Sequence, residues 1–291
     1  MYSEQIAIVT PSFKRDLELC RALNRSVQEF LPEAVRHYIV VDRRDLRNFL
    51  PLSSRRTIVL CKEDVLPKSI IQLPRMNRWL TTATVLPISG WLVQQIAKIA
   101  MASLLSESTL LMVDSDAVFV RDVEPSIFAR DGKTRLYCNR DGITPDMTAH
   151  IAWHRNACVL LGLPKQTLPL DDYIGQVISW KRELVLRMCE RLEQVSGHRW
   201  YDAIARIRQF SEYLLYGIFI QRVLGTEGNV WIDERARCNS HWATSKLSET
   251  DITDFVGSLE ADELALMISA HSGTTHDTRA AAISLATNGR L

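Results

Sequence analysis

Two aspartates interrupt an apolar stretch near the middle of the sequence. Residues 110–113 are apolar, Asp114 and Asp116 follow with Ser115 between them, and residues 117–120 are apolar again. In a regular strand, side chains two residues apart share a face, so both carboxylates would point the same way. Such a pair repels and is costly to bury unless a cation neutralises it. Mn²⁺ and Mg²⁺ prefer oxygen ligands and also bind substrate phosphates, so the pattern predicts a metal–diphosphate site. The alternative is two exposed acids in a turn at a strand end.

A glutamate among apolar residues is a candidate general base. Glu212 lies in RIRQFSEYLLYGIF, where helical spacing at i, i+3 and i+7 puts Gln209, Glu212 and Tyr216 on one face. Its apolar neighbours favour a raised carboxyl pKa, which suits a group that accepts a proton near neutral pH. The alternative is a solvated glutamate on the surface of a helix.

A second acidic pair and a tryptophan are candidates for binding an acceptor. Asp171 and Asp172 precede a predicted helix, and the favoured interpretation is that one caps the helix while the other stabilises its positive end. Acceptor binding or base chemistry is the other interpretation of this pair. Trp153 lies in a loop-like context, where a sugar ring can stack on it, although core packing explains a tryptophan equally well.

Composition sets broad limits on these hypotheses. The chain has 291 residues, 46% of them hydrophobic and 24% charged, with a net charge of +1. This balance is typical of a soluble globular protein and gives no sign of a nucleic-acid partner. The six cysteines are scattered without a CxxC pair, which favours reduced thiols over disulfides or a zinc site. The sequence has no signal-peptide pattern and no spanning apolar run, so we expect a cytoplasmic protein, in solution or at a membrane surface.

Alternating patterns in the first 125 residues must position the aspartates. Short apolar runs at 5–13, 35–46 and 54–64 predict strands, and the helical spacing within 14–31 predicts a helix between the first two. The aspartate pair then follows as part of a fourth predicted strand over 110–120. This alternation predicts an α/β fold with a mainly parallel sheet flanked by helices.

The segment before the aspartates mixes an irregular stretch with a buried helix. Residues 68–90 give no clean period and predict an irregular excursion. Residues 91–108 predict a helix that is apolar except for a stripe of Gln94, Gln95 and Lys98. Because a helix that is apolar all round is buried, this stripe must meet polar groups inside the protein.

The second half of the chain reads as mainly helical. Residues 134–140 and 150–163 predict a further strand and a short helix, and residues 171–195 and 201–224 predict two long helices. No repeat or Gly/Ser-rich linker divides the chain. We therefore expect one domain over 1–291, with two halves at 1–125 and 126–291.

The order of these segments resembles that of glycosyltransferases with the GT-A fold. LLMVDSDAVFVRDVE resembles their Asp-x-Asp segment, AIVTPSFKRD their first strand and nucleotide loop, YIVVD their second strand, and GWLVQQIAKIAMA the helix before the Asp-x-Asp strand. FSEYLLYG and SAHSGT resemble later segments of an uncharacterised bacterial group of such enzymes, the DUF6492-type family. The resemblance covers roughly residues 5–275, and it implies a nucleotide-sugar-binding half at 1–125 and an acceptor-binding half at 126–291.

The resemblance implies roles for the metal-binding residues. Asp116 would bind the metal directly, Asp114 would reach it through water or hold the donor ribose, and the Ser115 N–H would contact the nucleotide. A late histidine commonly completes the metal shell of such enzymes, and His271 matches it by order, with His241 as the competitor.

The resemblance also implies a nucleotide site at the ends of the first two strands. Thr10, Pro11 and Ser12 would line the nucleotide, Asp42 would accept a hydrogen bond from the base or ribose, and Lys98 would reach the diphosphate. The alternatives are ordinary loop or surface roles.

The sequence therefore predicts a metal-dependent glycosyltransferase in which Glu212 activates an acceptor hydroxyl, with inversion at the sugar. The donor would be a nucleoside diphosphate sugar, with a UDP-sugar expected, and the acceptor a glycan or a lipid-linked sugar in surface polysaccharide or glycolipid assembly. A nucleotidyltransferase or phosphoryl-transfer enzyme is one alternative, and a noncatalytic nucleotide-sugar-binding module is another.

A basic segment suggests where a membrane would contact the protein. Residues 67–82 contain Lys68, Arg75, Arg78 and Trp79 among isoleucine and leucine residues. Basic residues beside an interfacial aromatic ring suit an anionic bilayer, as at the inner face of the cell membrane. The preferred interpretation of the segment is a flap over the donor site.

Overall fold

A computed structural model describes residues 5–73 and 76–288 as a mixed α/β protein with several small sheets. The α-helices of the described residues are α1 (Leu17–Phe30), α2 (Leu46–Phe49), α3 (Lys62–Val65), α4 (Gly90–Leu104), α5 (Thr148–Leu161), α6 (Arg182–Ser196), α7 (Trp200–Ile207), α8 (Glu212–Ile218), α9 (Glu249–Gly257) and α10 (His276–Asn288). The strands are β1 (Ile6–Pro11), β2 (Arg36–Val41), β3 (Thr57–Cys61), β4 (Ile70–Gln72), β5 (Arg78–Thr81), β6 (Ile88–Ser89), β7 (Thr109–Met112), β8 (Ala117–Phe119), β9 (Ala129–Arg130), β10 (Lys133–Tyr137), β11 (Asn139–Ile143), β12 (Leu170–Asp172), β13 (Ile178–Lys181), β14 (Val230–Asp233), β15 (Cys238–His241) and β16 (Ala265–Ile268).

The largest sheet has five strands in the order β13-β7-β1-β2-β3. The strands β7, β1, β2 and β3 run parallel, and β13 runs antiparallel to β7. Val9 pairs with Met112 in the register of β1 and β7, so the two strands end together at one edge. The start of β13 reaches the same edge because Ile178 pairs with Met112. Ligands of open α/β sheets bind outside such carboxyl ends, and this is where the predicted aspartates follow β7.

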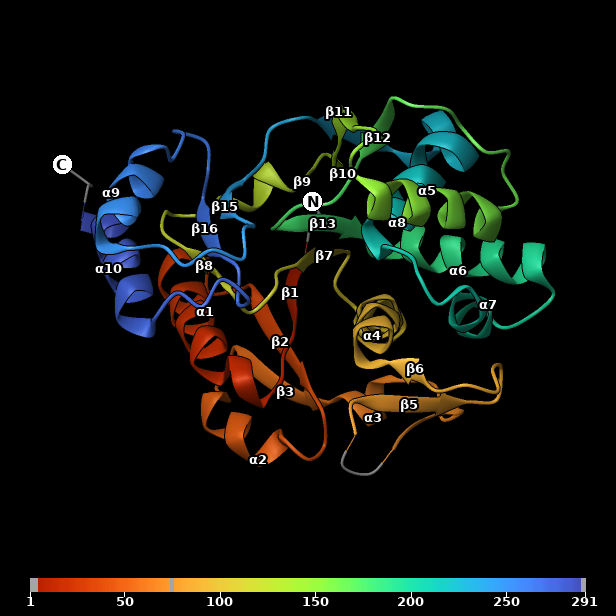
Figure 1. The fold of residues 1–291 in the computed structure, drawn as a ribbon, viewed down its shortest axis with the longest axis horizontal. Coiled ribbons are helices and arrows are strands. Elements are labelled where there is room, and N and C mark those ends of the chain that lie inside the picture. Colours follow the sequence, from red (N-terminus) through yellow and green to blue (C-terminus); the bar gives the residue numbers. More distant parts are fainter. Residues whose placement is uncertain (1–4, 74–75, 289–291) are drawn as a thin grey trace.

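Helices and a second sheet cover the two faces of this sheet. The alternation of side chains along β1 sends Ala7 and Val9 into a core shared with α4, α5, α6, α7 and α8. The same alternation sends Ile6 and Ile8 into a core shared with α1 and with Phe119 of β8. In Figure 1, α1, α9 and α10 lie to the left of the central sheet, and α4 to α8 lie to its right.

The predicted strand over 110–120 is two strands of different sheets. β7 ends at Met112 and belongs to the central sheet, whereas β8 pairs antiparallel with β16. Between them the backbone turns, and the Ala117 N–H donates to the Asp114 carbonyl at 3.1 Å. The aspartates therefore lie in a turn, and their shared direction does not come from strand periodicity.

Both long helices predicted in the second half are interrupted. Residues 171–181 of the first form β12, a connection and β13, and the helix α6 begins at Arg182. The second breaks after α7, where Arg208 has a φ of 66°, and α8 starts at Glu212. Gln209 thus lies outside the helix of Glu212, and the prediction of a shared helical face with Gln209 is wrong. Tertiary contacts override helical spacing at both interruptions.

Other expectations have mixed outcomes. The helix predicted within 14–31 is α1, and the apolar helix after residue 90 is α4. The excursion predicted to be irregular contains the antiparallel sheet β4-β5-β6. Within the described residues the fold is mixed: the central sheet has mainly parallel strands, whereas the sheets β14-β10-β9 and β15-β16-β8 each combine one parallel and one antiparallel pair. All six cysteines are free and buried, as expected. Among the described residues, no helix is long and apolar enough to cross a membrane.

Candidate functional site

A cavity of about 840 Å³ lies at the carboxyl edge of the central sheet. Its lining comes from segments that are far apart in the sequence, including the loop after β1, the turn after β7, the helices α4, α5 and α8, and the loop after β16. Nine of the residues predicted to have functional roles line it: Pro11, Lys98, Asp114, Ser115, Asp116, Trp153, Asp172, Glu212 and His271.

A buried lysine links two of the predicted acids at the floor of this cavity. Lys98 of α4 is 3% exposed, and its Nζ lies 2.9 Å from Asp114 Oδ1 and 3.0 Å from Glu212 Oε1. It also donates to the Tyr213 hydroxyl at 2.9 Å. Burial by itself lowers the pKa of the Lys98 ammonium, but Asp114, Tyr213 and Glu212 outweigh burial and raise that pKa well above its usual value. Lys98 therefore supplies a permanent positive charge to the site.

The polar stripe of α4 meets polar groups, as the sequence predicts. Gln94, Gln95 and Lys98 all line the cavity. The Gln95 Oε1 accepts a hydrogen bond from the Glu212 N–H at 3.2 Å. This N–H belongs to the first turn of α8, where backbone donors lack partners within the helix. The stripe thus anchors the start of α8 as well as holding the charges.

Burial alters the acidity of the carboxyl groups around the Asp-x-Asp turn. The pKa of Asp116 is raised from 3.8 to about 6, first by burial and then by the charge of Asp114. The pKa of Glu212 is also raised by burial, against the opposing effect of Lys98. Burial raises the pKa of Asp16; the charge of His271 lowers this pKa, and the charge of Asp114 raises it. Ionised Asp116 is therefore poorly compensated by the protein alone, and a bound cation would relieve this.

The loop after β16 closes one side of the site. The Ala270 N–H donates to Asp116 Oδ2 at 2.9 Å, and His271 of this loop lines the cavity. Arg279 of α10 holds the loop, because its guanidinium donates to the carbonyls of Ile268, Ser269 and Thr274. This anchoring fixes the backbone donor that Asp116 uses.

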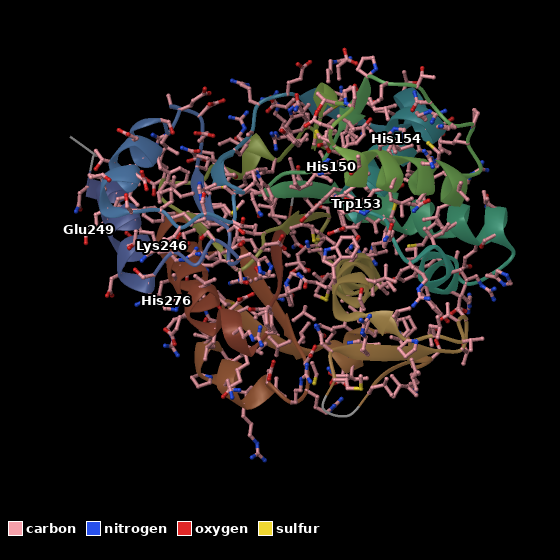
Figure 2. All side chains as sticks on the ribbon, in the orientation of Figure 1. His150, Trp153, His154, Lys246, Glu249 and His276 are labelled. Atoms are coloured by element: carbon pink, nitrogen blue, oxygen red, sulfur yellow. The ribbon has the colours of Figure 1, made fainter. Side chains whose placement is uncertain are left out.

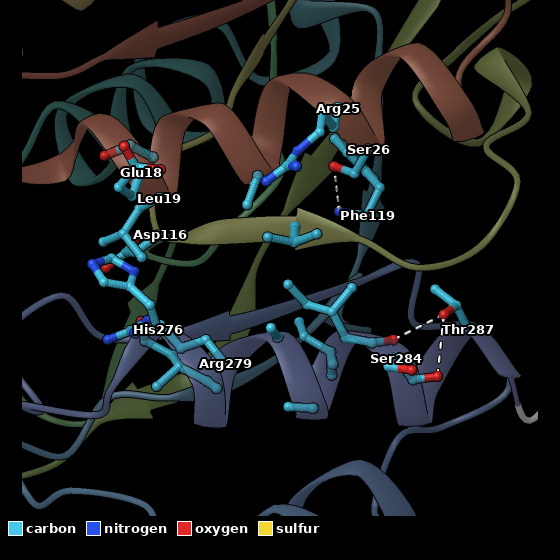
Figure 3. Close-up of a pocket in the computed structure, with 18 of the residues that line it drawn as sticks. Glu18, Leu19, Arg25, Ser26, Asp116, Phe119, His276, Arg279, Ser284 and Thr287 are labelled. Carbon is cyan, nitrogen blue, oxygen red and sulfur yellow. Dashed lines mark hydrogen bonds between the residues drawn. The ribbon is translucent and has the colours of Figure 1, made fainter.

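Asp116 also borders a second cavity, of about 560 Å³, between α1 and α10. Figure 3 shows Asp116, His276 and Arg279 at one end of this cavity, with β8 between the two helices. The rest of its lining mixes apolar residues, such as Leu19, Phe119 and Ile283, with charged and polar ones, such as Glu18, Arg25 and Glu29. The chemistry-bearing residues gather in the larger cavity.

Another part of the lining of the larger cavity carries aromatic rings and a histidine. The rings of Trp91 and Trp153 have centroids 5.6 Å apart, and His150 lies 5.1 Å from Trp153. Figure 2 labels His150 and Trp153 on α5. The His150 Nδ1 is 2.9 Å from Asp172 Oδ2. Trp153 therefore lines the cavity, on a helix and in an aromatic cluster, and its contact with a sugar stays a prediction.

Three residues predicted to bind the nucleotide are buried and are not part of the cavity lining. The Thr10 hydroxyl is buried and hydrogen-bonded to His37 Nε2 at 2.9 Å, and Ser12 is also buried. Asp42 is 2% exposed and is paired with Lys62, Arg44 and Gln72. Burial alone raises the pKa of Asp42, but Lys62 and its other partners lower it overall. Nucleotide binding by Thr10, Ser12 and Asp42 stays a prediction.

The second acidic pair does not cap a helix. Asp171 and Asp172 lie in β12, and the Asp171 Oδ1 accepts the Asp141 N–H at 3.1 Å. Of the two, Asp172 lines the cavity. The competitor histidine, His241, is bonded through Nε2 to the Ser245 carbonyl and is not part of the cavity lining.

Sequence reasoning missed several residues at or beside the site, among them Asp16, Trp91, His150 and Arg279. His150 and Trp153 are three residues apart on a helix, and this spacing puts them on one face. Asp16 closes the AIVTPSFKRD segment that resembles a nucleotide loop. Nothing local identifies Trp91 or Arg279, since their roles come from contacts with distant segments.

The donor set fits a hard cation. Within residues 5–73 and 76–288, no three His, Cys, Asp or Glu side chains are grouped to hold a metal by themselves. Mg²⁺ usually uses one or two carboxylates and completes its shell with water and substrate phosphates. Asp114 Oδ1 is buried and, within the described residues, has no well-directed hydrogen bond despite the nearby Lys98. Asp114 and Asp116 together meet this requirement.

Comparison with known proteins gives a family but no activity. No curated protein matches the sequence. Residues 3–259 match a family described as being of unknown function, DUF6492. The match covers β1, the Asp-x-Asp turn, α5 and α8, and ends before β16 and the loop of His271. On this match, the chain is a member of the DUF6492 family.

Proposed function

We propose that this protein is a metal-dependent glycosyltransferase that moves a sugar from a nucleoside diphosphate to a hydroxyl group. The observation that carries the proposal is the Asp114–Ser115–Asp116 turn. It lies at the carboxyl edge of the central sheet and opens into a cavity of about 840 Å³. This volume is in the range of small-molecule sites. The GT-A character of the fold is part of this proposal and is supported by the order of strands around the turn.

The floor of the cavity suits the diphosphate end of the donor. Asp114 and Asp116 would hold Mn²⁺ or Mg²⁺, with His271 as a further ligand, and Lys98 adds a fixed positive charge beside Asp114. The metal, when bound, supplies positive charge that stabilises the departing diphosphate. The protein itself positions the two carboxylates: the turn brings them together, Lys98 contacts Asp114, and the Ala270 N–H donates to Asp116.

The rim of the cavity suits a sugar. Five Phe, Tyr and Trp residues line the cavity: Phe13, Trp91, Trp153, Tyr213 and Trp242. Phe13 is 39%, Trp91 44% and Trp242 56% exposed, which is unusual for such large rings. Flat rings beside carboxylates are the surfaces on which pyranose rings stack while their hydroxyls form hydrogen bonds. The aromatic rim favours glycosyl transfer over phosphoryl transfer to a small acceptor.

The biological setting follows from the family resemblance. We propose a UDP-sugar as the donor and a glycan or lipid-linked acceptor, in bacterial surface polysaccharide or glycolipid assembly at the inner face of the cell membrane. The DUF6492 match is compatible with this setting but names no substrate.

The proposal is tested by calorimetric titration of UDP and of UDP-sugars in the presence of Mn²⁺ and in EDTA. We expect UDP to bind with Mn²⁺ and to raise the melting temperature, because a ligand at 100 times its Kd adds about 2.7 kcal/mol to the free energy of unfolding. EDTA should abolish both effects. Asp116→Asn should weaken Mn²⁺-dependent binding at least tenfold, while Asp254→Asn, an exposed acid on α9, should bind as the wild type does.

The products separate the proposed reaction from the alternatives. Release of UDP from a UDP-sugar supports glycosyl transfer. Release of UMP would instead indicate phosphoryl or nucleotidyl transfer at the aspartates. Tight Mn²⁺-dependent binding with no release of either product would indicate a noncatalytic binding module. No binding with any nucleotide would reject the donor site altogether.

A further inference from the structure

A hydrogen-bonded histidine and aspartate lie in the cavity wall away from the metal-binding acids. His150 of α5 and Asp172 of β12 are joined by a contact of 2.9 Å between Nδ1 and Oδ2. Asp172 is buried, and its Oδ1 accepts the Ile174 N–H at 3.0 Å, so both carboxylate oxygens have defined partners. Within the part of the chain that the structure describes, neither residue forms a hydrogen bond or ion pair with Asp114, Asp116 or His271. The pair is thus a separate feature of the same cavity.

The contact fixes the tautomer of the imidazole. An ionised carboxylate can only accept a hydrogen bond, so Nδ1 of His150 must carry the hydrogen. In the neutral ring the lone pair then lies on Nε2, which makes no hydrogen bond within the described part of the chain. The His150 side chain is 23% exposed and lines the cavity. An oriented imidazole with a free lone pair and a carboxylate behind it is the arrangement of a general base.

Glu212, the base predicted from the sequence, is less available. Its side chain is 5% exposed, and Oε1 is 3.0 Å from the Lys98 ammonium. Lys98 also contacts Asp114, so Glu212 belongs to the diphosphate end of the cavity. Glu212 is therefore better placed to hold Lys98 than to accept a proton from an acceptor hydroxyl.

The surroundings of His150 suit an acceptor sugar. The Trp153 ring lies 5.1 Å from the imidazole, and the Trp91 ring lies 5.6 Å from Trp153. A pyranose ring that rests on these indoles would bring its hydroxyls to the imidazole. The acceptor class indicated is therefore a saccharide with a free hydroxyl, in place of a simple alcohol or water.

Building on the proposed function, we propose that His150 is the general base of the transfer and that Asp172 is its positioning residue. The acceptor hydroxyl gives its proton to Nε2 of His150, and its oxygen bonds to the anomeric carbon of the donor sugar. The bond from that carbon to the diphosphate oxygen breaks, and its electron pair leaves on the nucleoside diphosphate. Asp172 stabilises the imidazolium, which returns the proton to solvent. A single displacement of this kind inverts the anomeric centre.

The decisive variants are His150→Gln, His150→Ala and Glu212→Gln. Glutamine can still donate to Asp172 but cannot accept the proton, so a purely structural histidine would tolerate it. We expect His150→Gln to lower kcat for UDP release from a UDP-sugar, with an octyl glycoside as acceptor, by about 10²–10⁴-fold. Mn²⁺-dependent UDP affinity should stay unchanged. Added imidazole should restore part of the activity of His150→Ala, and His198→Gln, an exposed histidine elsewhere, should match the wild type.

The outcomes separate this inference from the function on which it rests. Near-normal kcat in His150→Gln, or product with retained configuration, overturns the role of His150. Loss of activity in Glu212→Gln with His150→Gln active would return the role to Glu212. A wild-type protein that neither binds nor releases UDP overturns the proposed function itself.

A spectroscopic measurement tests the pair without any substrate. Two-dimensional ¹⁵N–¹H spectra of the histidine side chains should show His150 as the Nδ1–H tautomer at pH 8, and Asp172→Asn should change this signal. Because neutral histidine in water favours the Nε2–H form, an Nε2–H signal from His150 at pH 8 would reject the pair.

Discussion

At the residue scale, the site is governed by where its charges are compensated. Asp114 and Glu212 share the ammonium of Lys98, at 2.9 and 3.0 Å, and so have a positive charge within the protein. Asp116 accepts a hydrogen bond from the Ala270 N–H, and burial and the charge of Asp114 favour its neutral form. The carboxylate best suited to a cation is therefore the one that the fold compensates least.

This imbalance predicts a pH-dependent cost of ionised Asp116. Its pKa is about 6 in the folded protein against an ordinary 3.8, so the folded state holds the proton more tightly. The tighter binding of this proton stabilises the folded protein fully below pH 3.8, and this stabilisation is lost as the pH rises through about 6. Without divalent cations, Asp116→Asn should therefore raise the free energy of unfolding at pH 7.5 by on the order of 2 kcal/mol. The gain should shrink toward pH 4.5.

Urea unfolding at the two pH values measures this difference. Asp254→Asn, on the exposed face of α9, serves as the control and should change stability little at either pH. A less stable Asp116→Asn protein at pH 7.5 would show that the ionised carboxylate is better compensated than these contacts indicate.

At the scale of elements, a glycine lets α8 approach the strand that carries Asp172. The Tyr173 ring follows Asp172 and packs on Gly217 of α8, where an added Cβ would lie 2.2 Å from two ring atoms. The Tyr173 hydroxyl also donates to Gln221 Oε1 at 2.6 Å, which fixes the ring in this place. This packing holds α8, which begins at Glu212, against the segment of Asp172 and Tyr173, and Asp172 in turn contacts His150.

Gly217→Ala should therefore destabilise the protein, although alanine is the better helix former. Overpacking of a buried contact costs about 1–3 kcal/mol, whereas the helical preference for alanine returns about 1 kcal/mol. We expect a lower free energy of unfolding and a weaker His150–Asp172 contact, seen as a changed histidine ¹⁵N signal.

The matched control is Gly257→Ala in α9, where no heavy atom lies within 4 Å of the added Cβ. This variant should be neutral or slightly more stable. Equal effects of the two substitutions would mean that the Tyr173 ring moves away from Gly217 at little cost.

At the scale of the whole molecule, an exposed apolar surface marks the sheet β4-β5-β6. Its exposed side chains are Ile71, Met76, Leu80, Val85 and Leu86, with Val85 98% exposed. Lys68 and Arg78 of the same segment are exposed, whereas Trp79 is fully buried and offers no interfacial ring. Arg75, also named in the sequence prediction, lies outside the described residues. The segment leads directly into α4, whose second residue, Trp91, lines the cavity.

This surface predicts binding to anionic membranes, where a lipid-linked acceptor would reside. Substitution of both Val85 and Leu86 by Asp should weaken co-sedimentation with phosphatidylglycerol vesicles at least about tenfold, because each buried aliphatic side chain contributes about 1.5–3 kcal/mol. Val159→Asp, an exposed apolar position on α5, is the control. Unchanged binding in the double variant would leave the segment as a flap over the site.

The amino-acid sequence by itself determined the local features of this protein. The apolar runs of β1, β2, β3 and β7, the helices α1 and α4, and the acids after β7 follow from composition and periodicity. The sequence also predicted that the polar stripe of α4 contacts other polar groups, because buried polar groups need partners. These features depend on neighbours within a few residues of each other.

Only the tertiary structure decided which distant groups meet. Helical spacing predicted one helix over 171–195, but pairing of Ile178 with Met112 makes β13 a strand of the central sheet. Asp172 of β12, the strand before β13, contacts His150, and the local spacing of the sequence does not predict this contact. The Ala270 N–H reaches Asp116 across 154 residues of sequence. Long-range strand pairing and burial outweigh local propensity at these points, and they assemble the site from residues that the sequence keeps apart.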